Sequence, residues 1–262
     1  MTIDQIESVN IASGGTGFVA NSLTLKDAQA RTVTITGAQD FALTAGVSGT
    51  KLGTAGDATN GKGVSLIDAS AMTGKFTLVT NAYIEVPLGG VSTVKGGSGD
   101  DDITVALAKS VVQAGAGNDK ITVAAAASTT LTGGDGKDTF VLTSAIATST
   151  TAGETIITTI TDYDRANDTI QIGDALPFKK FVPTSGNSFT AVLTAALDAS
   201  AGGAELGSAV WFTYGGDTYI AKQDGSTGTF DAQDIIVKLT GVVDLTSAAD
   251  NANATTGLVG TA

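Results

Sequence analysis

Three copies of one short glycine- and aspartate-rich pattern follow one another between residues 96 and 141. They are Gly-Gly-Ser-Gly-Asp-Asp-Asp-Ile-Thr from Gly96, Ala-Gly-Ala-Gly-Asn-Asp-Lys-Ile-Thr from Ala114, and Gly-Gly-Asp-Gly-Lys-Asp-Thr-Phe-Val from Gly133. The copies start 18 and 19 residues apart, which is the length of one solenoid turn built from two halves. The intervening halves, 105–113 and 123–132, lack the pattern. The spacing therefore predicts a parallel β-solenoid whose aspartate loops stack on one edge.

The residue types in these copies suit the chemistry of calcium. Glycine accepts positive φ, so the backbone can turn tightly and direct carbonyl oxygens at a common centre. Aspartate supplies negative charge and further oxygens. Ca²⁺ takes six to eight oxygen ligands at about 2.3–2.6 Å, which two adjacent loops can supply together. The pattern therefore predicts Ca²⁺ along one edge of the solenoid.

The three copies resemble the calcium-binding nonapeptide of RTX proteins. The resemblance implies a right-handed parallel β-solenoid or β-roll, and it makes Asp101, Asp119 and Asp138 the principal side-chain ligands. Asp100 and Asn118 are the expected helpers, whereas Lys137 departs from the pattern in the third copy. The turn glycines of the expected site are Gly97, Gly99, Gly115, Gly117, Gly134 and Gly136. Ordinary surface turns are the alternative, because Gly, Asn and Asp are common in turns, but three copies in register argue against it.

Composition excludes several classes of protein. Fourteen basic residues against 26 acidic ones give the 262-residue chain a formal charge of −12, so nucleic acid is not an expected partner. Aspartate accounts for 22 of the 26 acids, which favours turns and metal binding over helical surface. Cysteine and histidine are absent, which leaves no disulfide, no His-dependent catalytic triad and no usual zinc site. We therefore expect a protein that is not an enzyme and that Ca²⁺ stabilises.

Short alternating segments predict strands through most of the chain. They lie at 23–25, 33–35, 41–43, 65–67, 76–79 and 83–86. One inward residue per strand recurs at steps of eight to ten: Leu78, Val86, Val94, Ile103, Val112, Ile121, Leu131 and Phe140. Residues 47–63 predict a long loop, in which a solvated loop is preferred over an ion site at Asp57 and Asn60.

The region after residue 142 loses the repeat. Residues 155–172 are expected to cap the solenoid, and Asp162, Asp164 and Asp168 either hold a further Ca²⁺ or form a charged turn. Helical spacing predicts a helix over 188–200, and two β-rich runs about Gly215 and Gly216 predict a hairpin over 210–221. A strand is expected at 235–239. An Asx-type turn is preferred over a calcium loop at 224–234, and the tail 246–262 is expected to be disordered.

Three further stretches carry resemblances. Residues 67–74 are similar to segments that precede the glycine repeats in bacterial surface-layer (S-layer) proteins, and 162–172 resemble the end of many RTX solenoids. Residues 211–245 resemble the C-terminal module of proteins exported by type I secretion. These resemblances imply a solenoid domain at 1–172, with the repeats at 96–141 and the cap at 155–172. They also imply an α+β secretion-associated module at 173–262. An uncleaved C-terminal export signal would explain why residues 1–10 lack the usual secretory pattern.

The sequence therefore leads us to expect a structural protein of the cell surface. It would fold on binding Ca²⁺, self-assemble into an extracellular S-layer lattice, and interact with the type I secretion machinery. Upstream regions of a longer protein would contact lipopolysaccharide or cell-wall glycan. No apolar run approaches the ~20 residues of a membrane span, so we expect a soluble protein without membrane insertion. Two alternatives remain open, namely the secretion and folding tail of an RTX protease or lipase, and the end of a large adhesin.

Overall fold

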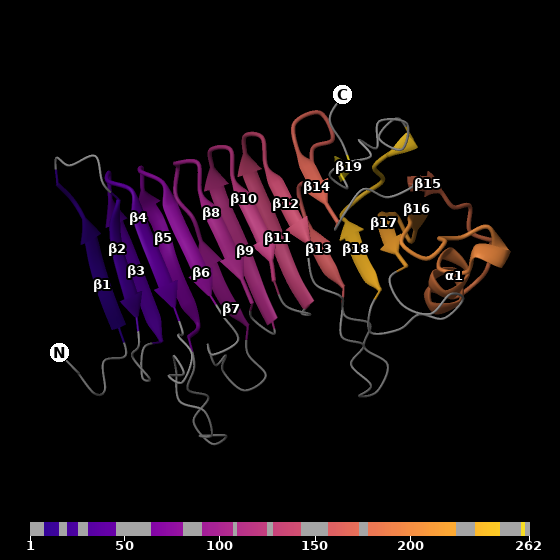
Figure 1. The fold of residues 1–262 in the computed structure, drawn as a ribbon, viewed down its shortest axis with the longest axis horizontal. Coiled ribbons are helices and arrows are strands. Elements are labelled where there is room, and N and C mark those ends of the chain that lie inside the picture. The colour runs from indigo at the N-terminus through magenta and orange to yellow at the C-terminus, as the bar shows by residue number, and fades with distance from the viewer. Residues whose placement is uncertain are drawn as a thin grey trace, which may run out of the picture. The chain divides into compact units, whose positions relative to one another are not determined.

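The computed structural model describes most of the chain and divides it into two compact units. The described residues are 8–15, 20–25, 31–45, 64–80, 91–106, 109–124, 128–142, 157–172, 178–223, 234–246 and 258–259. The first unit contains residues 1–125 and 129–139, and the second contains 126–128 and 140–262. Throughout the described residues the protein is mainly β, with one short α-helix (Figure 1).

Two long parallel sheets form the first unit. The chain alternates between them, so each pair of consecutive strands makes one coil of a parallel β-solenoid-like arrangement. One sheet has the order β1 (Ser8–Ser13), β3 (Thr32–Gly37), β5 (Leu66–Met72), β7 (Ser92–Lys95), β9 (Lys109–Ala116) and β11 (Ser128–Asp135). The other has the order β2 (Asn21–Leu25), β4 (Phe41–Ala45), β6 (Phe76–Thr80), β8 (Asp102–Val105) and β10 (Lys120–Val123).

Inward side chains stack from coil to coil and form the core. In one sheet Leu43 lies opposite Leu78, which lies opposite Ile103, and Ile103 lies opposite Ile121. A single coil cannot bury these side chains, so each depends on its neighbours. The predicted inward residues Leu78, Val94, Ile103, Val112, Ile121, Leu131 and Phe140 are all 0% exposed, which confirms the predicted period. Val86 and the loop at 47–63 lie outside the described residues.

The glycine-rich copies are only partly turns. Strand β9 continues through Ala116 and β11 through Asp135, so the first residues of the second and third copies are extended. Gly115 has φ +119°, which L side chains rarely adopt, and a Cβ atom there would collide with the carbonyl oxygen of Gly97. Glycine is thus needed at this position both for its backbone conformation and for the close approach of consecutive coils.

The second unit combines short strands with the helix. β12 (Thr139–Leu142) starts at the last residue of the first unit and belongs to a sheet with β14 (Thr169–Gln171) and β19 (Leu258–Val259). A second sheet has the order β13 (Thr158–Ile160), β18 (Ile235–Leu239), β17 (Asp217–Lys222), β16 (Ala209–Tyr214) and β15 (Phe178–Lys180). The predicted hairpin is confirmed, because β16 and β17 pair antiparallel about Gly215 and Gly216. The predicted strand at 235–239 is β18.

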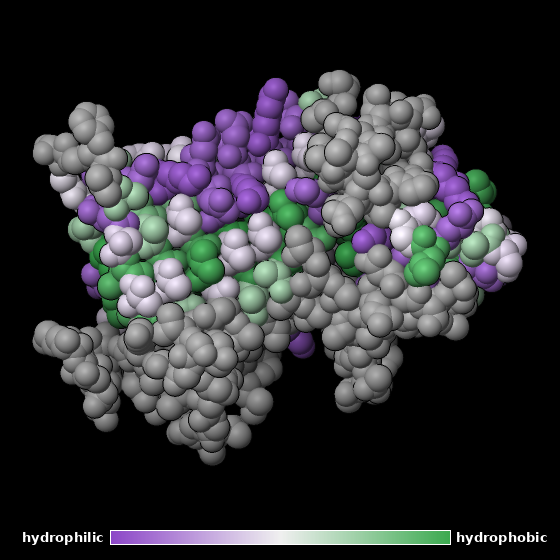
Figure 2. Space-filling view, in the orientation of Figure 1, coloured by the Kyte–Doolittle hydropathy of each residue, from purple (hydrophilic) through white to green (hydrophobic). Residues whose placement is uncertain are grey.

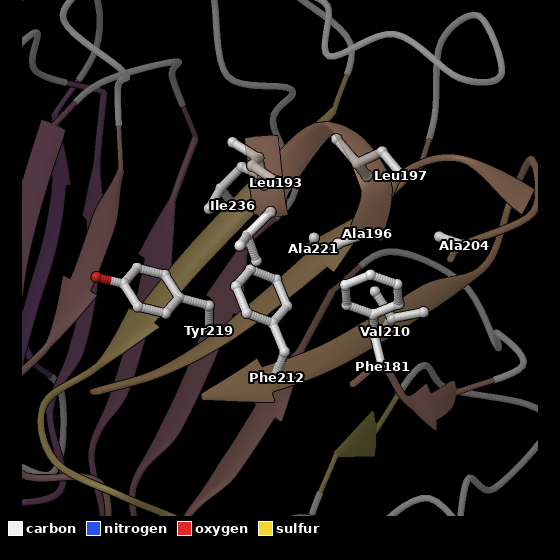
Figure 3. Packing of buried hydrophobic residues seen from close by; sticks show 11 residues of the cluster. Phe181, Leu193, Ala196, Leu197, Ala204, Val210, Phe212, Tyr219, Ala221 and Ile236 are labelled. Carbon is white, nitrogen blue, oxygen red and sulfur yellow. The ribbon is translucent and has the colours of Figure 1, made fainter. Parts of the chain in front are cut away.

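The helix is confirmed but is shorter than the predicted range. Helix α1 (Phe189–Ala196) begins after Ser188, whose hydroxyl accepts a 3.3 Å hydrogen bond from the N–H of Ala191. It ends early because Asp198 caps a separate 3₁₀ turn, η1 (Ala199–Ala201). One apolar cluster joins residues of α1 to residues of β16, β17 and β18 (Figure 3). Its members include Val192, Leu193, Ala196, Val210, Phe212, Tyr219, Ala221 and Ile236.

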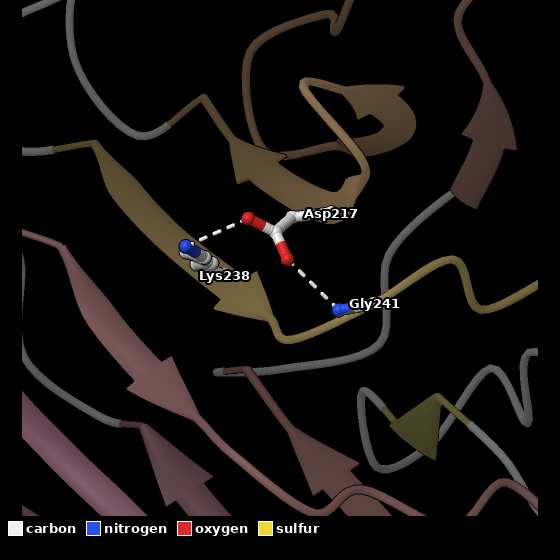
Figure 4. Close-up of polar contacts among 3 residues, drawn as sticks. All are labelled: Asp217, Lys238 and Gly241. Atoms are coloured by element: carbon white, nitrogen blue, oxygen red, sulfur yellow. Dashed lines mark hydrogen bonds and ion pairs between the residues drawn. The ribbon is translucent and has the colours of Figure 1, made fainter.

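One polar contact fixes the chain after β18. The carboxylate of Asp217 lies 2.7 Å from the ammonium group of Lys238 and accepts a 2.8 Å hydrogen bond from the N–H of Gly241 (Figure 4). Asp217 therefore ties the start of β17 to the end of β18 and to the following loop. Within the described part of the chain, we find no helix long and apolar enough to cross a membrane.

Candidate metal centre

A buried aspartate comes directly before each of three strands that follow one another in the order of one sheet, β8, β10 and β12. Asp101 precedes β8, Asp119 precedes β10 and Asp138 precedes β12. Each of the three side chains is 1% exposed. The register that pairs Asp102 with Lys120 places Asp101 opposite Asp119. The structure therefore brings the predicted principal ligands together in one inward column.

Hydrogen bonds connect this column from coil to coil. The N–H of Asp119 donates to Oδ1 of Asp138 at 2.9 Å, and the N–H of Asp101 donates to Oδ1 of Asp119 at 2.8 Å. The N–H of Phe76 donates to Oδ1 of Asp101 at 2.7 Å. Each carboxylate thus accepts a hydrogen bond from the backbone of the preceding coil. We call Asp101, Asp119 and Asp138 the aspartate ladder.

The second oxygens of the ladder differ in their surroundings. Oδ2 of Asp101 accepts a 2.8 Å hydrogen bond from the N–H of Gly97. Oδ2 of Asp119 is buried, and no group among the described residues donates a hydrogen bond to it. A buried carboxylate oxygen without a donor costs free energy unless a proton or a cation binds it. A cation bound at this oxygen of Asp119 would therefore stabilise the fold.

The electrostatics of the ladder favour binding of positive charge. Burial raises the pKa of Asp119 to about 7, and the negative charges of Asp101, Asp138 and Asp100 add to this rise. The hydrogen bond from the N–H of Asp101 opposes it. Burial also raises the pKa of Asp101, although two N–H donors and the charge of Lys75 act in the other direction. Like charges on neighbouring coils, about 4.8 Å apart, thus resist ionisation together.

The predicted helpers form a second, exposed column. Oδ1 of Asp100 accepts hydrogen bonds from the N–H of Asn118 at 2.7 Å and from its side-chain amide at 3.3 Å. Oδ1 of Asn118 accepts a 3.0 Å hydrogen bond from the N–H of Lys137. Figure 2 shows hydrophilic residues gathered along this rim of the strands. These side chains point to the next coil, whereas the ladder points to the preceding one.

The six predicted glycines also stack in columns. A Cβ atom at Gly134 would collide with the carbonyl oxygen of Gly115, as one at Gly115 would with that of Gly97. In the same way, a Cβ atom at Gly136 would collide with the carbonyl oxygen of Gly117, and one at Gly117 would collide with that of Gly99. The glycines therefore let the turns approach closely, and the N–H of Gly97 also contributes directly to the aspartate ladder.

The geometry of the described residues does not include a preformed cluster of ligands. Among them, no group of three or more His, Cys, Asp and Glu side chains is arranged to hold a metal ion. The physical reason is that each coil supplies one ladder carboxylate, and its Oδ1 is directed at a backbone N–H. The oxygen donors, the buried charge and Oδ2 of Asp119 nevertheless fit a hard cation that carboxylates and backbone carbonyls of adjacent turns would hold together.

In the loop at 162–168, two of the three aspartates hydrogen-bond within the loop. Asp164 accepts hydrogen bonds from the N–H of Ala166 at 2.9 Å and from the side-chain amide of Asn167 at 2.8 Å. Its own N–H donates to Oδ2 of Asp168 at 2.8 Å. The loop thus uses its carboxylates to hold its own backbone. The loop at 224–233 lies outside the described residues.

Sequence reasoning missed two features of this position in the coil. The column extends backwards into aromatic residues, because Phe41 lies opposite Phe76 and Phe76 stands opposite Asp101. Asp168 also precedes its strand, β14, and is 4% exposed. Asp168 was already a candidate ligand in the sequence, but the Asp-x-Ile or Asp-x-Phe pattern that it shares with Asp101, Asp119 and Asp138 was not used.

No protein-family model matches the chain, and no curated protein matches it in sequence.

Proposed function

We propose that this chain is a calcium-dependent structural protein of the RTX type. Its first unit is a right-handed β-roll that completes its fold when Ca²⁺ binds along the aspartate ladder. The observation that carries the proposal is the buried Oδ2 of Asp119, which has no hydrogen-bond donor among the described residues. The glycine columns and the repeated Asp-x-Ile or Asp-x-Phe signal support the same assignment.

Calcium suits these residues better than other common ions. The candidate donors are carboxylates, an amide oxygen and backbone carbonyls, which Ca²⁺ accepts in flexible geometry. Mg²⁺ requires near-octahedral geometry and keeps several waters, and zinc prefers the histidine and cysteine that the chain lacks. We expect at least two Ca²⁺, one shared by the turns of Asp101 and Asp119 and one by those of Asp119 and Asp138. Asp100 and Asn118 would assist, and Lys137 would add no carboxylate to the third turn.

The proposed role of the folded protein is self-assembly into an S-layer on the cell surface. The first coil supports self-assembly, because one of its inward side chains is more exposed to solvent than those at the same position in later coils. Leu23 in β2 is 36% exposed, whereas Leu43 and Leu78 at the same position are 1% and 0% exposed. β1 and β2 are edge strands without a charged residue or proline. Such edges pair readily with another chain, and an uncharged edge avoids repulsion between acidic copies.

Export by type I secretion completes the proposal. The second unit would carry the uncleaved signal, and upstream regions would attach the layer to lipopolysaccharide or cell-wall glycan. The protein would then be secreted without catalytic activity of its own. The tail of an RTX enzyme or the end of a large adhesin would contain the same solenoid and the same signal. Only self-assembly distinguishes an S-layer protein from these two alternatives.

Light scattering and electron microscopy of the purified protein test this proposal. Samples with Ca²⁺, with Mg²⁺ and with a chelator are compared at increasing protein concentration. The proposal predicts extended assemblies with Ca²⁺ and none under the other two conditions. A matched variant, Asp119→Asn, keeps the size of the side chain and should assemble only at higher Ca²⁺. Monodisperse monomer in Ca²⁺ at high protein concentration would favour the enzyme tail.

A further inference from the structure

One inward position of the first unit changes its chemistry along the solenoid. In the second and third coils it holds Phe41 and Phe76, which are 4% and 0% exposed. In the next coils it holds Asp101 and Asp119, each 1% exposed. The registers of β4 with β6, β6 with β8 and β8 with β10 place these four residues in one column. The column is therefore apolar in the second and third coils and acidic in the next two, and in the first coil it holds the exposed Asn21.

The two kinds of side chain place opposite demands on folding. A buried phenylalanine stabilises its coil through apolar contact and requires no ion. A buried, ionised carboxylate costs several kcal/mol unless positive charge or enough hydrogen bonds compensate it. Asp101 has two N–H donors, but Oδ2 of Asp119 has none among the described residues. The acidic coils therefore depend on a bound cation, and the aromatic coils do not.

The first three coils, formed by β1 to β6, have an apolar core of their own, whose buried side chains come from the second and third coils. Among their described residues, no buried side chain is charged. The core side chains are Val33, Ile35, Phe41, Leu43, Ala45, Val64, Ile67, Ala69, Met72, Phe76 and Leu78. About three stacked repeats are the least that an array of this kind needs for stability. These coils thus meet the minimum without any contribution from the aspartate ladder.

The junction between the two parts is specific. The N–H of Phe76 donates to Oδ1 of Asp101 at 2.7 Å, and the N–H of Ser98 donates to the carbonyl oxygen of Met72 at 3.0 Å. The third coil thus presents a donor and an acceptor that fix the first acidic turn. A folded third coil would already hold Asp101 in place for a cation to bind beside it.

We propose that β1 to β6 fold without Ca²⁺ and serve as the template on which the acidic coils, β7 to β11, fold when Ca²⁺ binds. The replacement of phenylalanine by aspartate between Phe76 and Asp101 marks the boundary. This inference rests on the proposed calcium function and adds where calcium dependence begins in the chain. It also explains how the acidic coils pair in the correct strand register, because the folded third coil fixes the first acidic turn before the others fold.

Hydrogen exchange of the full chain, followed by mass spectrometry, tests the template. In chelator, peptides within 32–45 and 66–80 should exchange at least tenfold more slowly than peptides within 96–124. In Ca²⁺ both groups should be protected. Equal loss of protection in both groups in chelator would overturn the template and leave the calcium function intact. Equal protection of both groups in chelator would instead overturn the calcium function, and with it this inference.

Two matched variants test the boundary itself. Phe76→Asp and Phe76→Asn lose the same volume but differ in charge. At mildly alkaline pH in chelator, Phe76→Asp should lose at least tenfold more protection within 66–80 than Phe76→Asn does. In the wild-type background, Asp119→Asn should gain protection within 109–124 in chelator, because it removes a buried charge and keeps both the side-chain size and the oxygen that accepts from the N–H of Asp101. Equal behaviour of the two Phe76 variants, or no gain with Asp119→Asn, would contradict the inference.

Discussion

The backbone N–H of Asp101 donates a 2.8 Å hydrogen bond to the carboxylate of Asp119 on the following coil. Under the proposed function Asp119 has two tasks, since its Oδ1 fixes the preceding coil and its Oδ2 would bind an ion. Removal of the whole side chain would disturb both tasks. The isosteric change to asparagine keeps the acceptor and removes the charge, so it separates the structural task from ion binding.

Replacement of Asp119 should change calcium binding more than replacement of either neighbour. We expect Asp119→Asn to lower the number of bound Ca²⁺ by up to two, because Asp119 is shared by both proposed sites. Asp101→Asn and Asp138→Asn should each lower it by at most one. Isothermal titration calorimetry gives the stoichiometry. Equal stoichiometry in wild type and Asp119→Asn would show that Asp119 is not a ligand.

The same variant should have the opposite effect without calcium. Asp119→Asn removes a buried charge, so the calcium-free protein should unfold at a higher urea concentration at mildly alkaline pH. Asp119→Ala should unfold at a lower one, because it leaves the N–H of Asp101 without its acceptor at a cost of about 1–3 kcal/mol. Urea titrations in chelator, followed by circular dichroism, measure both. Destabilisation by both substitutions to the same extent would contradict the account.

The stability of the calcium-free protein should fall as pH rises. Burial raises the pKa of Asp119 to about 7 in the folded state, whereas an aspartate in an unfolded chain titrates near about 3.9. Between these values the folded state binds more protons than the unfolded state, so each rise in pH favours unfolding. Thermal melts in chelator should show this fall, and Asp119→Asn should reduce it. A midpoint that rises over the same window would contradict the predicted direction.

Glycine substitutions should show how closely the turns stack. Gly115→Ala should destabilise the first unit by more than about 1–2 kcal/mol, because φ is +119° and the new Cβ would meet the carbonyl oxygen of Gly97. Gly14→Ala is the control, since nothing lies within 4 Å of its Cβ position and its φ is not in the positive range. Thermal melts in Ca²⁺ compare the two. Similar melting midpoints for both variants would argue against the stacked turns.

Much of the solenoid follows from periodicity in the sequence. Ile103 and Ile121 stand 18 residues apart and lie opposite each other in register, because one coil has that length. The three ladder aspartates were predicted as ligands from the resemblance of the copies to the RTX nonapeptide. The aromatic part of their column was not, because Phe41 and Phe76 are separated by 35 residues and a long loop interrupts the period. Only the strand register shows that Phe76 and Asp101 share one position.

The direction of each carboxylate could not be predicted either. The repeat suggests that Asp101, Asp119 and Asp138 face ions shared by adjacent turns, whereas the structure directs one oxygen of each at a backbone N–H. Such hydrogen bonds depend on how far one coil is shifted relative to the next, which composition and spacing do not determine. The exposed column of Asp100 and Asn118 points the other way for the same reason.

The most direct test of the calcium account is circular dichroism of the full chain during a calcium titration. In chelator the spectrum should lack part of its β signal, because the acidic coils cannot fold while the ladder carries uncompensated charge. Ca²⁺ should restore that signal and raise the melting midpoint, whereas Mg²⁺ at the same concentration should do so only weakly. An identical spectrum and melting midpoint in chelator and in Ca²⁺ would contradict the central claim.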